Sequence, residues 1–416
     1  MRIAYITADP GLPVFGKKGC SIHVQEVLRA MGRRGTRIDL FATNCSSGRE
    51  QAESGELTQA TASQLAVTEL GAVRLHPLPP APKGDLALRE QKCIDANEQI
   101  SRALQSEGPF DLVYERYSLW SFAGMEYARS TATPGLLEVN APLIEEQAEH
   151  RGLVDQASAR LISERVFRAA TALIAVSDEV AEHLEAFPAT RGKVRVVPNG
   201  VNPDRFPPGI RALLPAEPGT FTVGFVGTMK PWHGLPTLLE AFARFVRRHP
   251  ESRLLLVGDG AARAKLEEQA SALGLAQRAH FTGPVSPGEV PGLLASMDVG
   301  VAPYPALRNF YFSPLKVYEY MAAGLPVVAS QLGQLQKLIE PEIDGLLVPP
   351  GEVLALVAAL ERLKGDPELR LRLGQAARAK VIPGHTWDGA VRRIFAIAGL
   401  DSSPHAENEP RTANIA

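Results

Sequence analysis

Residues 313–330 read SPLKVYEYMAAGLPVVAS, and this stretch decides the fold class that the sequence predicts. A serine and a proline precede the run Leu315–Ala323, which is expected to form a helix. A glycine separates this helix from Pro326–Ala329, an apolar run with the length of a buried strand. A helix joined to an apolar strand through a short connection is the repeating unit of parallel α/β sheets.

The same alternation of apolar runs and helical stretches continues over both halves of the chain. Runs that are apolar on both faces are what a parallel sheet covered by helices requires. We therefore predict an α/β protein with two doubly wound parallel sheets. The expected strands of the first sheet are Ile3–Ile6, Ile38–Phe41, Leu112–Tyr114, Leu136–Val139, Leu173–Val176 and Val194–Val197. Those of the second are Phe221–Val226, Leu254–Val257, Val299–Ala302 and Pro326–Ala329, and its helices are Pro236–Arg248, Ala261–Leu273, Leu315–Ala323 and Val353–Lys364.

The length of 416 residues suits two such domains. Prolines crowd residues 202–218 and disfavour helix and strand there, so we place a hinge at this stretch. The predicted domains are 1–201 and 202–384. Residues 385–400 show one more helical pattern, which is expected to cross back to the first domain, and the polar tail 401–416 is predicted to be disordered.

Composition and charge exclude several classes of protein. With 44 basic and 46 acidic residues, the chain has no electrostatic footprint for nucleic acid. Cys20, Cys45 and Cys93 are too few and too scattered for a disulfide framework, which indicates a reducing compartment. No apolar run approaches the roughly 20 residues that cross a bilayer, and the N-terminus is typical of a first strand. We expect a cytoplasmic protein, with peripheral contact to the inner face of a membrane left open.

The first strand runs into a loop that contains Gly11, Gly16 and Gly19, and a helix is expected to begin near Ser21 as its N-cap. The amides of such a loop and helix start can bind an anion. The loop matches neither GxGxxG nor a P-loop, which disfavours a dehydrogenase or an NTPase. A plain glycine-rich turn is the alternative interpretation. Four apolar residues at helical spacing support the helix: Val24, Val27, Leu28 and Met31.

The stretch at residues 313–330 closely resembles the retaining, GT-B-fold glycosyltransferases of family 4, also called glycosyl transferases group 1. The resemblance extends from Met1 to about Gly399 through segments in a specific order: VSDEVAEHL, KVRVVPNGVNPDRF, LLLVGDG, FTGPVSPGEV and DGLLVPPGE. It implies two Rossmann-like domains facing across a cleft, with a nucleotide-diphosphate sugar on the second domain and the acceptor on the first. It also implies a hexosyltransferase-type enzyme that retains configuration by same-face attack, with UDP-sugar favoured over GDP-sugar and no protein nucleophile.

In this family, the helix of that stretch begins at the donor diphosphate and its glutamate faces the donor ribose. The resemblance therefore assigns the diphosphate to the helix start and the ribose to Glu319. Free first-turn amides and the helix dipole favour an anion there, and a carboxylate accepts hydrogen bonds from a diol. A solvent-facing role is the alternative for Glu319. The other expected donor contacts are Gly19, Gly227, Lys230, Val285, Phe312, Ser313, Pro314 and Leu315.

Two departures from the family pattern affect the donor site. Tyr311 stands where relatives carry a first glutamate near the sugar, so the sugar stays open and amides near Phe312 are expected to serve instead. In GTMKPWHG, residues 227–234, Thr228 and His233 stand where relatives carry two cations that reach the diphosphate. Lys230 and Lys316 are the candidate replacements.

We prefer Lys316 as the principal cation and as a catalytic residue, because its place in the phosphate turn is the more secure of the two. Stabilising the charge of a leaving group is usually the largest catalytic contribution of a site.

A third departure concerns the histidine that many relatives place after the strand Leu136–Val139. In LLEVNAPL, Asn140 matches this position best, and Glu138 is expected on the opposite side of the strand. Both are catalytic candidates. An asparagine cannot act as a base, but its amide can orient a sugar hydroxyl. Capping a loop is an equal alternative for Asn140.

Acceptor contacts are expected at Gly16, His23, Glu115 and Arg116. The last two lie in YERYSLWS at the end of a strand, where ligands gather in open α/β sheets. A structural ion pair is the alternative for Glu115 and Arg116, and core packing is the alternative for His23.

No cofactor or metal is expected beyond the sugar nucleotide, because no DxD pair or His/Cys cluster has ligand spacing. Two alternative functions are left open. One is a noncatalytic nucleotide-sugar-binding subunit, suggested by Tyr311, Thr228 and His233. The other is a GT-B-fold epimerase or phosphorylase. The sequence does not name the sugar or the acceptor, which in relatives is a glycan, a lipid or a small metabolite.

Overall fold

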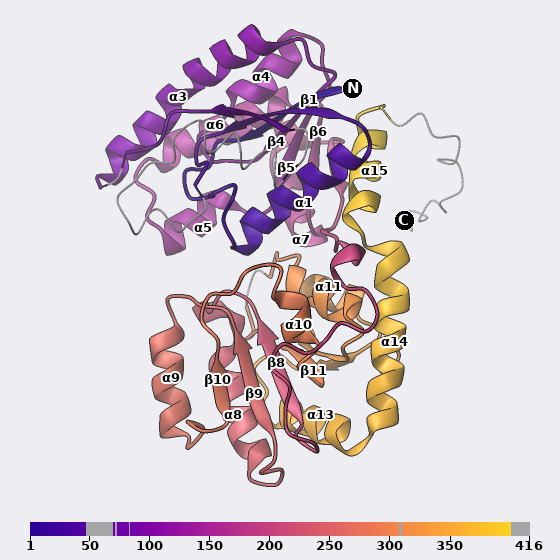
Figure 1. Cartoon of the computed structure of the whole chain (residues 1–416). Coiled ribbons are helices and arrows are strands. Elements are labelled where there is room, and N and C mark those ends of the chain that lie inside the picture. Colours follow the sequence, from indigo (N-terminus) through magenta and orange to yellow (C-terminus); the bar gives the residue numbers. More distant parts are fainter. Residues whose placement is uncertain (47–69, 71–72, 83, 308–309, 401–416) are drawn as a thin grey trace, which may run out of the picture.

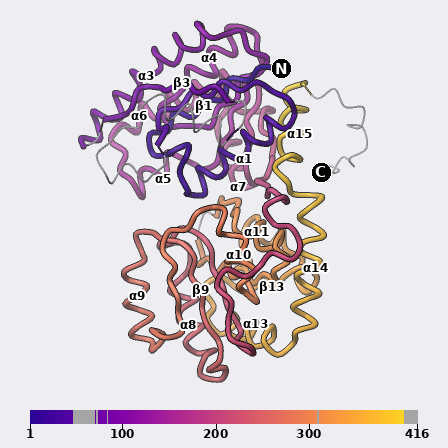
Figure 2. Tube along the Cα trace, viewed as in Figure 1, coloured from indigo at the N-terminus to yellow at the C-terminus, as the bar shows by residue number. Residues whose placement is uncertain are grey.

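The computed structural model describes residues 1–46, 70, 73–82, 84–307 and 310–400. Two α/β domains stand one above the other, and the C-terminal helices run from the lower domain back to the upper one (Figures 1 and 2). The two sheets have seven and six strands, all parallel in their recorded pairings, so the predicted fold class is confirmed. No helix in the described part of the chain could span a membrane.

The N-terminal sheet has the strand order β3-β2-β1-β4-β5-β6-β7. Its central strands are buried on both faces because helices cover both sides, as the unbroken apolar runs require. The strands are β1 Arg2–Thr7, β2 Arg37–Ala42, β3 Val73–Pro77, β4 Leu112–Arg116, β5 Gly135–Val139, β6 Ala172–Ala175 and β7 Val194–Val196. The helices are α1 Gly19–Arg33, α3 Leu86–Glu107, α4 Ala123–Ser130, α5 Leu143–His150, α6 Gln156–Ala169 and α7 Asp178–Glu185, followed by the 3₁₀ turn η1 Pro188–Thr190.

The C-terminal sheet repeats the doubly wound plan in the order β10-β9-β8-β11-β12-β13. Its strands are β8 Thr222–Val226, β9 Arg253–Val257, β10 Ala279–Phe281, β11 Val299–Ala302, β12 Val327–Ser330 and β13 Leu346–Val348. The α-helices are α8 Leu235–Val246, α9 Arg263–Ala272, α10 Val290–Leu294, α11 Leu315–Ala322, α12 Gly333–Leu338, α13 Val353–Gly365 and α14 Pro367–Gly384. The 3₁₀ turn η2, Pro203–Arg205, lies near the domain boundary, and the 3₁₀ turn η3, Pro231–His233, follows β8.

Three strands are not among those predicted from the sequence: β3, β10 and β13. Each is an outer strand of its sheet. Two of them have only three residues, and β3 carries an arginine and a histidine. Such short or polar edge strands give too little apolar pattern to be recognised.

The predicted N-cap of the first helix is wrong. Helix α1 begins at Gly19, and its N-cap Lys18 makes no side-chain capping bond. Ser21 lies inside the first turn and is completely buried. A side-chain carbon on Gly16 would come within 2.8 Å of the Ser21 hydroxyl, so the glycine lets the loop fold tightly over the helix.

The chain crosses between the domains twice, and the two crossings are hydrogen-bonded together. Val201 donates to the carbonyl of His385 at 2.9 Å, and Trp387 donates to the carbonyl of Val201 at 3.2 Å. A side-chain carbon on Gly200 would lie 2.4 Å from the Thr386 backbone, which makes glycine necessary at this close approach. After the second crossing, α15 Trp387–Ile397 packs on α1 and joins the core of the N-terminal domain (Figure 1).

Candidate active site

The turn before α11 is held between the two domains. Asn199, at the end of the N-terminal domain, donates its backbone N–H to Ser313 Oγ at 3.3 Å and its side-chain amide to the Ser313 carbonyl at 2.9 Å. Ser177 Oγ donates to the carbonyl of Tyr311 at 2.9 Å. Between the two domains, a side-chain carbon on Gly19 would lie 4.0 Å from Leu315 Cδ1. The starts of α1 and α11 therefore lie close together.

The first turn of α11 has no side-chain cap. Its N-cap is Pro314, which makes no capping hydrogen bond, and the turn carries no acidic residue. The buried Ser313 hydroxyl is already engaged by Asn199. The free amides of Leu315 and Lys316 and the positive end of the helix dipole thus form a local environment that favours an anion.

Lys316 is a buried ammonium group in this first turn. Its Nζ has no hydrogen-bond partner among the residues described and lies 4.2 Å from the ring centroid of Phe225 and 5.2 Å from that of Tyr304. A side-chain carbon on Gly227 would lie 3.2 Å from Nζ, so the glycine leaves room for the lysine. Burial lowers the pKa of Lys316 to about 7, although the charge of Glu319 opposes this shift. An uncompensated cation of this kind is costly unless an anion binds it.

The GTMKPWHG loop lies beside Lys316. His233 Nδ1 lies 2.6 Å from the Thr228 carbonyl and donates its proton to this oxygen, because a carbonyl can only accept. Burial, and then repulsion from Lys316, lowers the pKa of His233 to about 2. His233 is therefore neutral at working pH and cannot replace a cation. The Lys230 ammonium lies 5.4 Å from the Trp232 ring centroid.

Glu319 is bound to an arginine that the sequence did not single out. Arg205, in η2, donates to Glu319 Oε1 at 2.8 Å and to the carbonyl of Pro287 at 2.8 Å. Burial raises the pKa of Glu319, while the charge of Arg205 and its hydrogen bond lower it. The carboxylate is thus held by a linker residue and lies one turn along α11 from Lys316.

Tyr311 and Phe312 precede the turn at Ser313 and Pro314. The Tyr311 hydroxyl donates to Glu146 Oε2 at 2.9 Å, so a tyrosine at the family's glutamate position faces a carboxylate on α5 of the other domain. The Phe312 ring packs 4.4 Å from the Tyr311 ring. Val285, a predicted donor contact, is half-buried and packs on the C-terminal core.

Glu138 and His23 form a buried ion pair beneath α1. His23 Nε2 contacts Glu138 Oε1, the Arg116 guanidinium lies 3.9 Å from the same oxygen, and Trp387 packs edge-on against the His23 ring at 4.9 Å. Burial alone would raise the pKa of Glu138, but the charges of His23 and Arg116 outweigh it and hold this pKa at about 2. His23 is therefore packed inside the domain, as its alternative interpretation had it.

Strand geometry gives no reason to place Glu138 opposite Asn140, because residues two apart on a regular strand share a face, and β5 ends at Val139, one residue before Asn140. Glu138 shares the face of Leu136, which packs with α1. The Asn140 side chain is half-buried, and its Nδ2 has no hydrogen-bond partner in the described part of the chain. Asn140 thus has a free amide donor, and one guanidinium nitrogen of Arg116, another candidate in the N-terminal domain, likewise has no hydrogen-bond partner among the described residues.

The predicted acceptor contact at Glu115 is wrong. Glu115 is fully buried, receives a hydrogen bond from Ser121, and lies so close beneath α4 that a side-chain carbon on Gly124 would be 2.3 Å from Oε2. Burial raises its pKa to about 7. Gly16 is also buried, and its carbonyl accepts from Gln25 at 2.9 Å.

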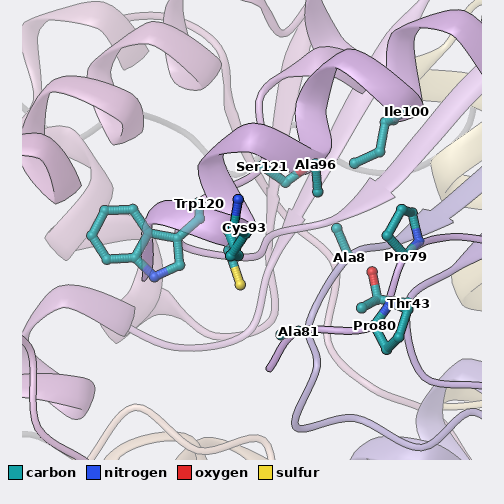
Figure 3. A pocket seen from close by; sticks show the side chains of 11 residues that line it. Ala8, Thr43, Pro79, Pro80, Ala81, Cys93, Ala96, Ile100, Trp120 and Ser121 are labelled. Atoms are coloured by element: carbon teal, nitrogen blue, oxygen red, sulfur yellow. The ribbon is translucent and has the colours of Figure 1, made fainter. Parts of the chain in front are cut away.

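Two small hollows lie in the N-terminal domain beside the predicted segment YERYSLWS. They share Cys93 of α3 and Trp120, and their cavity volumes are about 20 and 90 Å³. Figure 3 shows Trp120 and Cys93 on one side of the first hollow, with Ala8, Thr43 and Pro80 on the other. The second is lined by Arg89, Arg151 and other residues of α3, α5 and the loop after β1. The later residues of this segment, 118–121, line the hollows, whereas Glu115 and Arg116 do not. Each hollow is too small for a whole sugar nucleotide.

A group of three residues, Asp39, His76 and Glu107, has atoms close enough to hold a metal ion. These side chains are already paired with arginines: Arg2 Nε lies 2.7 Å from Asp39, and Arg74 lies 2.8 Å from Glu107. They lie on β2, on β3 and at the end of α3, and none of them is a predicted site residue. The group is an ion-pair network of the N-terminal sheet.

Sequence reasoning did not identify Arg205, which binds Glu319, or the contact between His150 and Trp232. The rings of His150, at the end of α5, and Trp232, in η3, stack between the two domains with centroids 4.9 Å apart. The only sequence signal for Arg205 is its position just after the NGV turn that ends the N-terminal domain.

Comparison with known families and proteins accounts for most of the chain. The family described as Glycosyltransferase Family 4 matches residues 18–205, and Glycosyl transferases group 1 matches residues 220–366. The chain is similar to a D-inositol 3-phosphate glycosyltransferase of Saccharomonospora viridis, with 29% identity over 86% of this chain and 84% of the relative. A protein of the same name from Streptomyces avermitilis is 32% identical over 68% of this chain and 64% of its own length.

Solved structures share the fold. Sucrose-phosphate synthase from Thermosynechococcus elongatus superposes with a TM-score of 0.69 at 23% identity, over 95% of this chain and 99% of that one. Anabaena Alr3699/HepE in complex with UDP-glucose gives a TM-score of 0.69 at 20% identity, over 96% and 99%. At these identities the likeness shows the fold alone.

Proposed function

The chain belongs to glycosyltransferase family 4 and has the GT-B fold, and from this premise we propose that it transfers a sugar from a nucleotide-diphosphate sugar with retention and without a metal. A UDP-sugar is the favoured donor, and a GDP-sugar is the second choice. The observation that carries the proposal is Lys316, a buried ammonium without a hydrogen-bond partner among the described residues, in the uncapped first turn of α11.

Lys316 and the start of α11 would stabilise the leaving diphosphate. As the sugar bond breaks, the diphosphate gains negative charge, and a preorganised cation and helix amides offset this charge most strongly in a dry site. Because His233 is neutral and Lys230 lies over Trp232, Lys316 is the better placed of the candidate cations. A helix start and an ammonium group can do this without a divalent ion.

The nucleoside end of the donor would lie farther along α11. The Glu319 carboxylate can accept hydrogen bonds from the ribose diol, and the loop at Val285 and Pro287 would border the base. Anabaena Alr3699/HepE has been solved with UDP and with UDP-glucose, which supports a uridine nucleotide as the first probe.

The acceptor would approach from the N-terminal domain. Asn140 Nδ2 is a buried donor that can orient a hydroxyl group, and the hollows around Trp120 can take parts of an acceptor. In same-face attack, the acceptor oxygen bonds to the anomeric carbon while the diphosphate leaves and a phosphate oxygen takes the acceptor proton. The names of the relatives make D-inositol 3-phosphate the first acceptor to test.

The test is an assay of nucleotide-diphosphate release from UDP- and GDP-sugars, with and without D-inositol 3-phosphate and with EDTA present. We expect slow release without acceptor and no loss of activity with EDTA. NMR of the product gives its anomeric configuration, and the same configuration as in the donor sugar would support retention. Binding without turnover on a broad acceptor panel would favour the noncatalytic subunit. Activity that is lost in EDTA and restored by magnesium or manganese would contradict metal independence.

A further inference from the structure

Arg205 belongs to neither predicted half of the site. It lies in η2, in the connection between the domains, yet its guanidinium reaches two elements that would border the nucleoside. It donates to Glu319 Oε1 on α11 and to the carbonyl of Pro287 in the loop before α10, both at 2.8 Å. The two donated bonds come from different nitrogens, Nη1 and Nη2, so one planar group bridges the two elements.

The surroundings of Glu319 make this arginine necessary. The Arg205 and Glu319 side chains are only 19% and 17% exposed, so the ion pair is partly shielded from water. Glu26, a buried carboxylate on α1, adds repulsion, and the Lys316 charge attracts Glu319 more weakly than Arg205 does. Burial raises the pKa of Glu319, and Arg205 acts most strongly against that shift. The arginine thus favours the ionised form of the carboxylate and holds it in one direction.

We propose that Arg205 is a positioning residue of the nucleotide site, which holds the Glu319 carboxylate toward the ribose diol and ties it to the loop at Pro287. The inference rests on the proposed donor site. Arg205 binds Oε1 and leaves Oε2 for the diol, and a planar guanidinium fixes the direction of a carboxylate better than an ammonium does. Loss of Arg205 should therefore weaken recognition of the ribose and leave the diphosphate contacts at the start of α11 intact.

The experiment is calorimetric titration of wild type, Arg205→Met and Arg205→Lys with three probes. The probes are the tighter-binding of UDP and GDP, its 2′-deoxy analogue, and inorganic pyrophosphate. For Arg205→Met we expect about tenfold weaker binding of the nucleotide, in the range for a hydrogen bond to a charged group. The 2′-deoxy analogue should lose clearly less, and pyrophosphate should bind as it does to the wild type. Arg205→Lys should be intermediate, because one ammonium replaces two fixed donors.

Arg33→Met is the matched control, since it removes an arginine from the ion pair with Asp388 on α15, away from the donor residues. It should bind all three probes like the wild type. Equal losses of Arg205→Met on all three probes, or no loss on the nucleotide, would overturn the inference while leaving the proposed function intact. Failure of the wild type to bind either nucleotide would instead contradict the proposed function, and the role of Arg205 would fall with it.

Discussion

The predicted site residues of the two domains differ in whether the protein itself supplies an oppositely charged group beside each buried charge. In the N-terminal domain, the buried Glu138 carboxylate lies against His23 Nε2 and 3.9 Å from the Arg116 guanidinium. In the C-terminal domain, the buried Lys316 ammonium lacks a hydrogen-bond partner in the described part of the chain and lies against aromatic rings. Removing one partner from a buried ion pair destabilises the fold, whereas a buried charge without a counter-charge itself costs stability and suits a ligand. The comparison predicts that substitutions on the two sides will affect different properties.

The largest expected effect is on stability, from Glu138→Ala. Removing one partner of a buried ion pair leaves the others uncompensated, which costs about 3–5 kcal/mol of unfolding free energy. Urea denaturation measures this cost. The control Glu126→Ala breaks an exposed pair with Arg165 and should cost less than about 1 kcal/mol. Equal costs for the two variants, or a large loss of nucleotide affinity in folded Glu138→Ala, would break the comparison.

Lys316→Met should show the opposite behaviour. We expect kcat to fall by about 10² to 10³, the size typical for one preorganised electrostatic contact, because the leaving diphosphate loses its cation. Thermal stability should stay equal or rise, since a buried uncompensated charge is removed. Steady-state kinetics and a melting curve check the two halves of the prediction. Lys230→Met is the control with the smaller expected loss, and the reverse order would move the assignment to the GTMKPWHG loop.

Glu319→Ala should weaken donor binding without a change of fold. Its hydrogen bonds to the ribose are expected to contribute about 1.5–3 kcal/mol, the range for a charged acceptor. This corresponds to roughly 10- to 150-fold in Kd, measurable by calorimetry with UDP. Circular dichroism controls for folding. If affinity is unchanged, Glu319 does not contact the ribose.

The smallest expected effect is on the number of protons that the protein takes up when UDP binds. Burial lowers the pKa of Lys316 to about 7 in the free protein, and a bound diphosphate would raise it again. UDP binding at pH 8 should therefore take up close to one proton, while binding at pH 6, where the lysine is already protonated, should take up little. Titrations in buffers of different ionisation enthalpy measure this uptake. Lys316→Met should abolish the difference between the two pH values, and a difference that persists would assign the proton to another group.

The residues predicted for the C-terminal domain lie closer together in the structure than those predicted for the N-terminal domain, for a physical reason. Ser313 directly precedes the N-cap of α11, and Lys316 and Glu319 lie one turn apart on this helix, so their spacing in the sequence already places them together. Contacts such as Arg205 with Glu319 join residues 114 positions apart, and no local pattern reveals them. Glu115 was misjudged because the end of a strand indicates a ligand region, but does not show which side chains point inward beneath the next helix. The sheets themselves were predictable where their strands are long and apolar.

The docking of α15 on the first domain sets an order of events during synthesis. Trp387, Val391 and Phe395 belong to the same buried cluster as Val24 and Val27, and Trp387 covers His23. Nearly the whole second domain must leave the ribosome before this covering helix appears. At roughly 5–20 residues per second, the delay is on the order of 10–40 s. Throughout that time the nascent first domain exposes the apolar surface that α15 later covers, including the His23 side chain. Folding of the first domain should therefore depend on chaperones during this interval and should be sensitive to truncations that remove α15.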